Sequence, residues 1–209
     1  MLEQITIWTL GWLGGVLSPA LVETIKRKHE TTAVLSAVKT ELNEVGYRLV
    51  LASYSIEQHL GTTDRSFLKW VQDSMVVYHG DEPTESIAKY ISAQLSWTDE
   101  QLAVHVANEA AQGVKALTVP KFAMPFSDTK VPGWHAIPPN VRLGLLAIHT
   151  DIELINDAVD QTRNYFNLTF TKLESNHETV VQNLRGAYKQ YGKRCRLAAQ
   201  RMQRLHALL

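Results

Sequence analysis

The last third of the sequence carries two long runs of apolar or uncharged residues spaced at alternating steps of three and four. The first run is Leu145, Ile148, Ile152, Ile155, Val159, Thr162, Phe166, Thr169 and Leu173. The second run is Val181, Leu184, Tyr188, Tyr191, Cys195, Ala198, Met202, Leu205 and Leu209. This period places all members of a run on one helical face and is typical of left-handed coiled-coil packing. We therefore predict two long helices with buried seams.

The segment between the two runs predicts a turn. Ser175 and Glu178 have the spacing of a capping box, which marks the start of a helix. The step from Leu173 to Val181 also breaks the three–four alternation. An antiparallel hairpin is favoured over the alternative, one continuous rod.

The two arms of this hairpin differ in charge. The first arm is acidic, with Asp151, Glu153, Asp157 and Asp160, whereas the second has no acid after Glu178 and many arginines and lysines. The arms can neutralise each other, or the basic arm can contact anionic lipid head groups. Nucleic acid is not favoured as a partner, because Tyr188 and Tyr191, the aromatic residues among the cations, belong to the seam.

Helical signals continue through the preceding part of the chain. Val34, Val38, Leu42, Val45, Leu49, Ala52 and Ile56 form an apolar stripe. It predicts a helix to about Leu60, where Gly61 supplies a stop. We expect a second helix capped by Asp64 and ending at Gly80. A third begins at Pro83, and a fourth runs from the Thr98 capping box to Gln112. No segment reads as a strand, so the fold class is all-α.

The first two dozen residues indicate a membrane anchor. Residues 4–22 include no charged side chain, and Lys26, Arg27 and Lys28 follow closely. About 19 helical residues rise roughly 28 Å, close to the ~30 Å hydrocarbon core of a bilayer. Because the positive charges follow the apolar stretch, the segment resembles a spanning helix rather than a cleaved secretion signal. We expect the amino terminus outside the cell membrane and the bulk of the chain in the cytoplasm.

Small residues interrupt this stretch and allow two further interpretations. Gly11 and Gly15 form one small-xxx-small pair and Gly14 and Ser18 form another, which would let two anchor helices approach closely. Alternatively, the helix ends near the glycine pair and restarts with Ser18 as N-cap and Pro19 in its first turn. The short first helix would then lie in the membrane interface or on the protein's own core.

Residues 118–139 contain five of the seven prolines, so neither a helix nor a central strand can persist there. Phe122, Phe126 and Trp134 make the segment too apolar for a solvated linker. It is either an ordered strap across the bundle or a partner-binding loop.

Composition and motifs do not point to an enzyme. The formal net charge is zero, and the single cysteine, Cys195, excludes an internal disulfide and a cysteine-rich metal site. Cys195 also belongs to the seam, which favours a packed residue over a reactive thiol. Glu174 and His177 have the Glu-x-x-His spacing of a di-iron bundle, but the second copy that such a site requires is missing from the sequence. We expect no catalytic residue, cofactor or metal.

The expected architecture is a membrane anchor at 1–25 followed by a cytoplasmic helical bundle at 26–209, with the strap at 118–139. The function that fits best is a membrane-anchored interaction or scaffold protein without catalytic activity. Its partners would be membrane lipid and another protein or a second copy. The alternative is a membrane-disrupting effector whose anchor helices oligomerise.

Overall fold

The computed structural model is all-α, as the periodicities predict. It describes residues 2–78, 82–111, 117–125, 134, 137–171 and 176–209, with side chains from residue 23 onward except those of 82–84 and 171. The helices are α1 (Leu2–Leu60), α2 (Arg65–Val77), α3 (Glu82–Ser96), α4 (Asp99–Ala111), α6 (Pro139–Thr171) and α7 (His177–His206). No strand occurs within these ranges.

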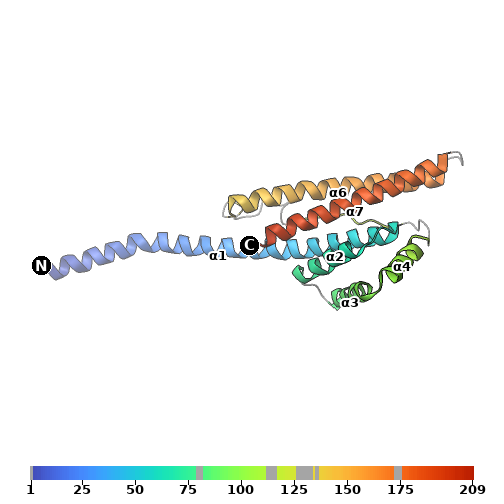
Figure 1. The fold of residues 1–209 in the computed structure, drawn as a ribbon. Helices are drawn as coiled ribbons and strands as arrows, with labels where there is room; N and C mark the ends of the chain where they lie inside the picture. Colours follow the sequence, from blue (N-terminus) through green and yellow to red (C-terminus); the bar gives the residue numbers. More distant parts are fainter. Residues whose placement is uncertain (1, 79–81, 112–116, 126–133, 135–136, 172–175) are drawn as a thin grey trace.

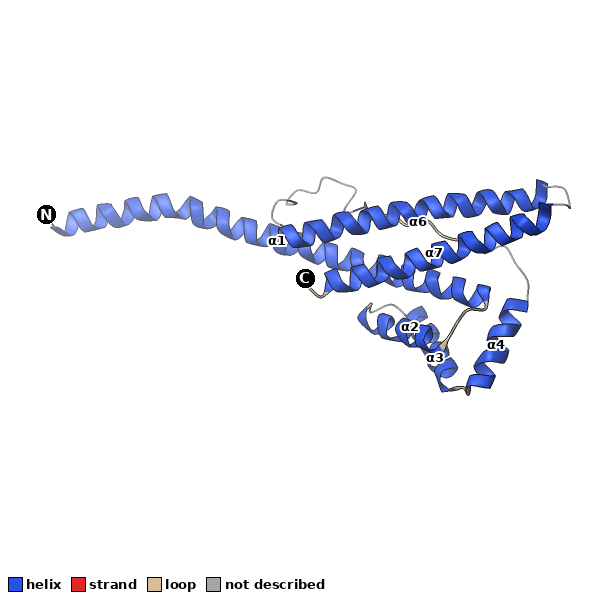
Figure 2. Ribbon diagram, turned by 45° about the horizontal axis from the view of Figure 1, so that its top comes forward, coloured by secondary structure: helices blue, strands red, loops and turns tan. Residues whose placement is uncertain are grey.

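Helix α7 is the central element of the bundle. It lies between α6 on one side and α1 on the other, and packs along much of both (Figure 1). α2 and α4 contact α1, and α3 contacts α2, which places the three short helices together on one side of the long ones (Figure 2). The hydrophobic core runs between these helices from Val34 to Leu205.

Helix α1 continues unbroken from Leu2 to Leu60, through the glycines and proline that suggested a break. At 1.5 Å per residue, this helix is about 88 Å long. All seven residues of the predicted stripe from Val34 to Ile56 are buried, which confirms the stripe. Residues 23–30 are all exposed, because the first part of α1 extends away from the bundle (Figure 1).

The predicted helix boundaries at residues 61, 64 and 98 are confirmed by hydrogen bonds. Gly61 has a positive φ of 68°, and the N–H groups of Gly61 and Thr62 bond to carbonyls in the last turn of α1. Asp64 accepts a 2.7 Å bond from the Phe67 N–H. Thr98 and Gln101 bond each other reciprocally, side chain to backbone, as a capping box does.

Two expected boundaries need correction. α2 ends at Val77 rather than Gly80, because the Tyr78 backbone caps it while the side chain enters the core. The N-cap of α7 is Asn176, and it makes no side-chain capping bond. Ser175, the predicted cap, lies outside the described residues.

The C-terminal helices form the predicted antiparallel hairpin (Figure 1). The proposed seam residues Leu184, Tyr188, Tyr191, Cys195, Met202 and Leu205 are all buried. However, Ala187 on one flank of this seam and Gly192 and Ala199 on the other flank are buried too. A two-stranded coiled coil buries one narrow stripe per helix, whereas α7 buries a wider surface because it packs on both α6 and α1.

The described residues from Val34 to the C-terminus therefore form a packed helical bundle, and α1 before Val34 is one helical extension. No helix within the described residues is both long and apolar enough to cross a bilayer. The predicted helix-association face, at Gly11, Gly14, Gly15 and Ser18, belongs to the part of α1 that is described by its backbone alone.

Candidate functional site

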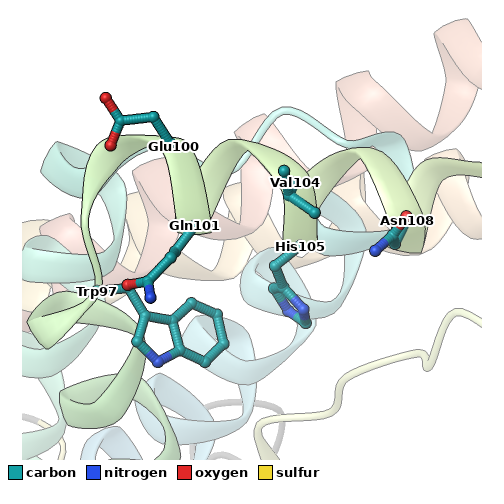
Figure 3. Close-up of a pocket in the computed structure, with 6 residues that line it drawn as sticks. All are labelled: Trp97, Glu100, Gln101, Val104, His105 and Asn108. Carbon is teal, nitrogen blue, oxygen red and sulfur yellow. The ribbon is translucent and has the colours of Figure 1, made fainter.

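A surface groove of about 460 Å³ runs along α4. It is lined by Trp97, Glu100, Gln101, Val104, His105 and Asn108 (Figure 3). The rings of Trp97 and His105 lie on the same side of α4, and their centroids are 5.0 Å apart in an edge-on arrangement. Val104 is 61% exposed beside them. The groove therefore presents apolar and aromatic surface to a ligand.

A polar network under this groove fixes His105. The His105 Nε2 atom lies 3.1 Å from Gln94 Nε2 and 3.2 Å from the Tyr90 hydroxyl. The amide oxygen of fully buried Gln94 accepts a 3.0 Å bond from the Tyr54 hydroxyl. Burial raises the pKa of Tyr54 to about 12, so Tyr54 remains a donor. This arrangement is satisfied when His105 Nε2 is unprotonated and accepts from both neighbours.

That geometry gives His105 a structural role. In that tautomer the Nε2 lone pair accepts hydrogen bonds from Gln94 and Tyr90 within the protein. Elsewhere in the described part of the chain, no group of three or more His, Cys, Asp or Glu residues could hold a metal ion.

Arg65 secures the junction between α3 and α4 beside the groove. Its guanidinium donates to the carbonyls of Leu95 at 2.6 Å and Trp97 at 2.8 Å. It also pairs with Asp99 at 2.8 Å. A planar guanidinium can satisfy several acceptors at once, so one side chain caps the end of α3 and orients Trp97.

A second candidate site is formed by residues 117–125, which include the described first part of the proline-rich segment 118–139. From here on, the strap means residues 117–125. Val119, Phe122 and Met124 of the strap are buried in the core. The Arg48 guanidinium from α1 lies 5.8 Å from the centre of the Phe122 ring. The described first part of the proline-rich segment is therefore packed on the bundle.

Side chains of the hairpin bind the main chain of the strap. Asn156 of α6 accepts from the Phe122 N–H at 2.9 Å and donates to the Phe122 carbonyl at 2.8 Å. The Tyr188 hydroxyl accepts from the Leu117 N–H at 3.2 Å and donates to its carbonyl at 3.1 Å. Tyr191 donates to the Pro120 carbonyl at 2.9 Å. Burial raises the pKa of both tyrosines, which keeps them as donors.

The three proposed partner-loop residues differ in their environments. Phe122 is only 4% exposed, so its ring serves the core rather than a surface. Trp134 is half-buried against the core. Phe126 lies outside the described residues.

Among the described residues of the hairpin, one direct ion pair joins the two arms. Arg201 contacts Asp151 at 2.8 Å and also donates to the Ala147 carbonyl. Burial raises the pKa of Asp151, and the Arg201 charge partly offsets this. Asp160 pairs instead with Lys121 of the strap at 2.7 Å. An acidic residue of the first arm thus also binds the strap.

Cys195 and the basic residues Lys26, Arg27 and Lys28 lie in opposite environments. Cys195 is fully buried, and burial raises the pKa of its thiol to about 12, which makes it a packed rather than a reactive residue. Lys26, Arg27 and Lys28 are all exposed on the extension, where Arg27 pairs with Glu23 at 3.0 Å.

The sequence did not mark one polar residue in each of these two sites. Gln94 and Asn156 are single polar residues on amphipathic helices, and nothing in their spacing marks them as buried or as bound to a distant main chain. In comparisons with known proteins, no protein-family model, curated protein or solved structure matches this chain.

Proposed function

We propose that this protein is a membrane-anchored helical interaction protein without catalytic activity. The single observation that carries the proposal is the course of α1, which leaves the bundle and continues as a helix to Leu2. The anchor would comprise residues 1–25, and the bundle of residues 26–209 would stand in the cytoplasm and bind other proteins.

The energetics of an isolated helix favour a membrane environment for the start of α1. Helices without tertiary contacts are only marginally stable in water, even with favourable sequences. Residues 4–22 are uncharged and largely apolar, so water is a poor environment for them. A bilayer removes both problems, because it solvates apolar side chains and favours backbone hydrogen bonds within the helix.

The orientation follows from the exposed cations. Lys26, Arg27 and Lys28 follow the uncharged stretch closely. Their side chains are exposed, so contacts within the bundle do not account for them. Cations flank membrane helices on the cytoplasmic side, so the bundle would be cytoplasmic and the amino terminus outside. A second copy could pair with the anchor through Gly11 and Gly15.

The bundle supports a binding role rather than catalysis. The α4 groove offers exposed apolar surface, and the histidine beside it is engaged by its neighbours. An apolar groove with a few fixed polar groups is the usual form of a binding site.

Membrane fractionation tests the proposal directly. We expect the full chain to remain in the membrane pellet after an alkaline wash and to be released by detergent. The double variant Leu10→Arg/Val16→Arg should become soluble, because two charges in the hydrocarbon core cost several kcal/mol. The matched control Lys39→Arg/Thr40→Arg, on the exposed face of the same helix, should stay in the pellet. Recovery of the full chain in plain buffer would refute the anchor.

The continuity of α1 also favours one second candidate function, a membrane-disrupting effector. Because one helix joins the anchor to the bundle, assembly of bundles would force the anchors together at Gly11 and Gly15. Overexpression would then be toxic, and Gly11→Leu/Gly15→Leu should remove the toxicity while leaving the protein in the membrane. Equal toxicity of a chain that starts at Ile25 would exclude this candidate.

A further inference from the structure

The strap is held in the way that binding proteins hold an extended peptide. Asn156 and Tyr188 each bond both the N–H and the carbonyl of one strap residue, and Tyr191 bonds a further carbonyl. Main-chain bonds of this kind supply affinity that does not depend on the peptide sequence. The hairpin therefore recognises an extended backbone rather than this particular segment.

The side chains of the strap are also arranged like those of a bound peptide. Val119, Phe122 and Met124 are buried, whereas Thr118, Pro120 and Lys121 are exposed. Lys121 reaches Asp160 of α6 at 2.7 Å. Apolar anchors with polar residues between them are what gives specificity to extended-peptide recognition.

The strap does not fill the space available to it. A cavity of about 260 Å³ lies on the α1 side of Leu117, Thr118 and Val119. A second cavity of about 140 Å³ lies on the other side of the same residues, against Phe166 and Tyr188. Close packing is the rule in protein interiors, so a groove wider than its occupant indicates room for larger side chains.

We infer that the groove between α1, α6 and α7 is a peptide-binding site, which the strap occupies as an internal placeholder. The ligand would be an extended apolar segment of a partner protein with larger residues than Leu117 to Val119. If the strap of a second copy bound in this groove, it would form only the contacts that it loses in its own protein. Both cavities would then remain empty. A partner segment that fills them gains buried apolar surface. The inference does not depend on the membrane anchor.

The test uses full-length protein in detergent and labelled peptides based on residues 117–125. In the protein, Lys121→Glu places a carboxylate opposite Asp160 and weakens the strap without changing the core. The native peptide should bind this variant about tenfold more tightly than wild type, because a tethered strap competes at millimolar effective concentration. A peptide with Thr118→Leu should bind about fivefold more tightly still.

Two further variants locate the binding. Adding Asn156→Ala to Lys121→Glu should weaken peptide binding at least tenfold, since it removes both bonds to Phe122. The matched control, Asn164→Ala, changes an exposed asparagine two turns along α6 and should leave binding unchanged. A control peptide with Phe122→Asp should not bind.

Hydrogen exchange on wild type provides a readout without any mutation. Saturating Thr118→Leu peptide should accelerate exchange of the strap amides of Leu117 and Phe122, which are now bonded to Tyr188 and Asn156. The inference is overturned if no peptide binds Lys121→Glu at 1 mM, or if Asn156→Ala binds equally well. It also falls if the Thr118→Leu peptide binds no better than the native one, which would favour strap exchange between copies.

Discussion

The hydroxyl of Tyr78, at the end of α2, donates a 2.8 Å hydrogen bond to the carbonyl of Ala199 on α7. The two residues are far apart in sequence, and the Tyr78 ring passes α1 at Gly46 to make the contact. Tyr78 is completely buried, and burial raises the pKa of its hydroxyl. One side chain thus ties the short helices to the central helix across α1.

Removing this hydroxyl should destabilise the fold. We expect Tyr78→Phe to lower the free energy of unfolding by about 1–2 kcal/mol, because a buried hydrogen bond is lost. Tyr47→Phe is the matched control, since the buried Tyr47 hydroxyl has no hydrogen-bond partner among the described residues. It should be neutral or slightly stabilising in the same urea titration. Equal losses in both variants would contradict the role assigned to the Tyr78–Ala199 bond.

Gly46 provides the space that Tyr78 needs. A Cβ atom at this position would lie 2.4 Å from the Tyr78 ring. We expect Gly46→Ala to cost about 2–3 kcal/mol through overpacking. At Gly186 on α7 a Cβ would meet nothing within 4 Å. Gly186→Ala should therefore stabilise the helix by up to about 1 kcal/mol. Thermal denaturation followed by circular dichroism gives both values, and a tolerated Gly46→Ala would show that the helix contact is not tight.

The guanidinium of Arg65 should not be replaceable by lysine. A lysine ammonium cannot reach the Leu95 and Trp97 carbonyls and Asp99 together, so we expect Arg65→Lys to cost about 1 kcal/mol. The backbone amides of Ser96 and Trp97 should also exchange faster with solvent. Arg27→Lys, in an exposed ion pair on the extension, is the control and should change neither measurement.

His59 should make stability depend on pH. Its ring packs edge-on against Tyr188 at 5.5 Å, and burial, reinforced by the nearby Arg185 charge, lowers its pKa below the ordinary 6.5. The unfolded chain then binds a proton more readily than the folded one, so stability is complete above pH 6.5 and declines as the pH falls toward the folded-state pKa.

Denaturation at pH 7.5 and pH 5.0 tests this coupling. His59→Gln should reduce the difference in unfolding free energy between the two pH values. His29→Gln, at an exposed histidine on the same helix, is the control and should leave the difference as in wild type. An unchanged difference in His59→Gln would show that another group carries the pH dependence.

Much of the fold follows from local signals. The Val34–Ile56 stripe, the two seams, the Gly61 stop and the caps at Asp64 and Thr98 each depend on residues within one or two helical turns. Such signals fix where helices lie and which face is apolar, because helix geometry converts sequence spacing directly into direction. The sequence could therefore predict an all-α chain with an antiparallel C-terminal hairpin.

Contacts between distant segments could not be read in this way. The seam of α7 predicts one buried face, but only its position between α1 and α6 explains why Ala187, Gly192 and Ala199 are buried as well. The strap was recognisable as apolar, yet its partner Asn156 looks in sequence like any surface asparagine. A single polar side chain carries no periodic signal, so its partner becomes known only when the helices are packed.

The sequence by itself determined the helices, their apolar faces and the uncharged stretch that leads into α1. The tertiary structure alone decided that α7 is central and that Tyr78 crosses α1 at Gly46. It also decided that Asn156, Tyr188 and Tyr191 bind the main chain of the strap. The physical reason is one of range: helix propensity and amphipathicity act over a few residues, whereas hydrogen bonds between segments depend on the final packing of the whole chain.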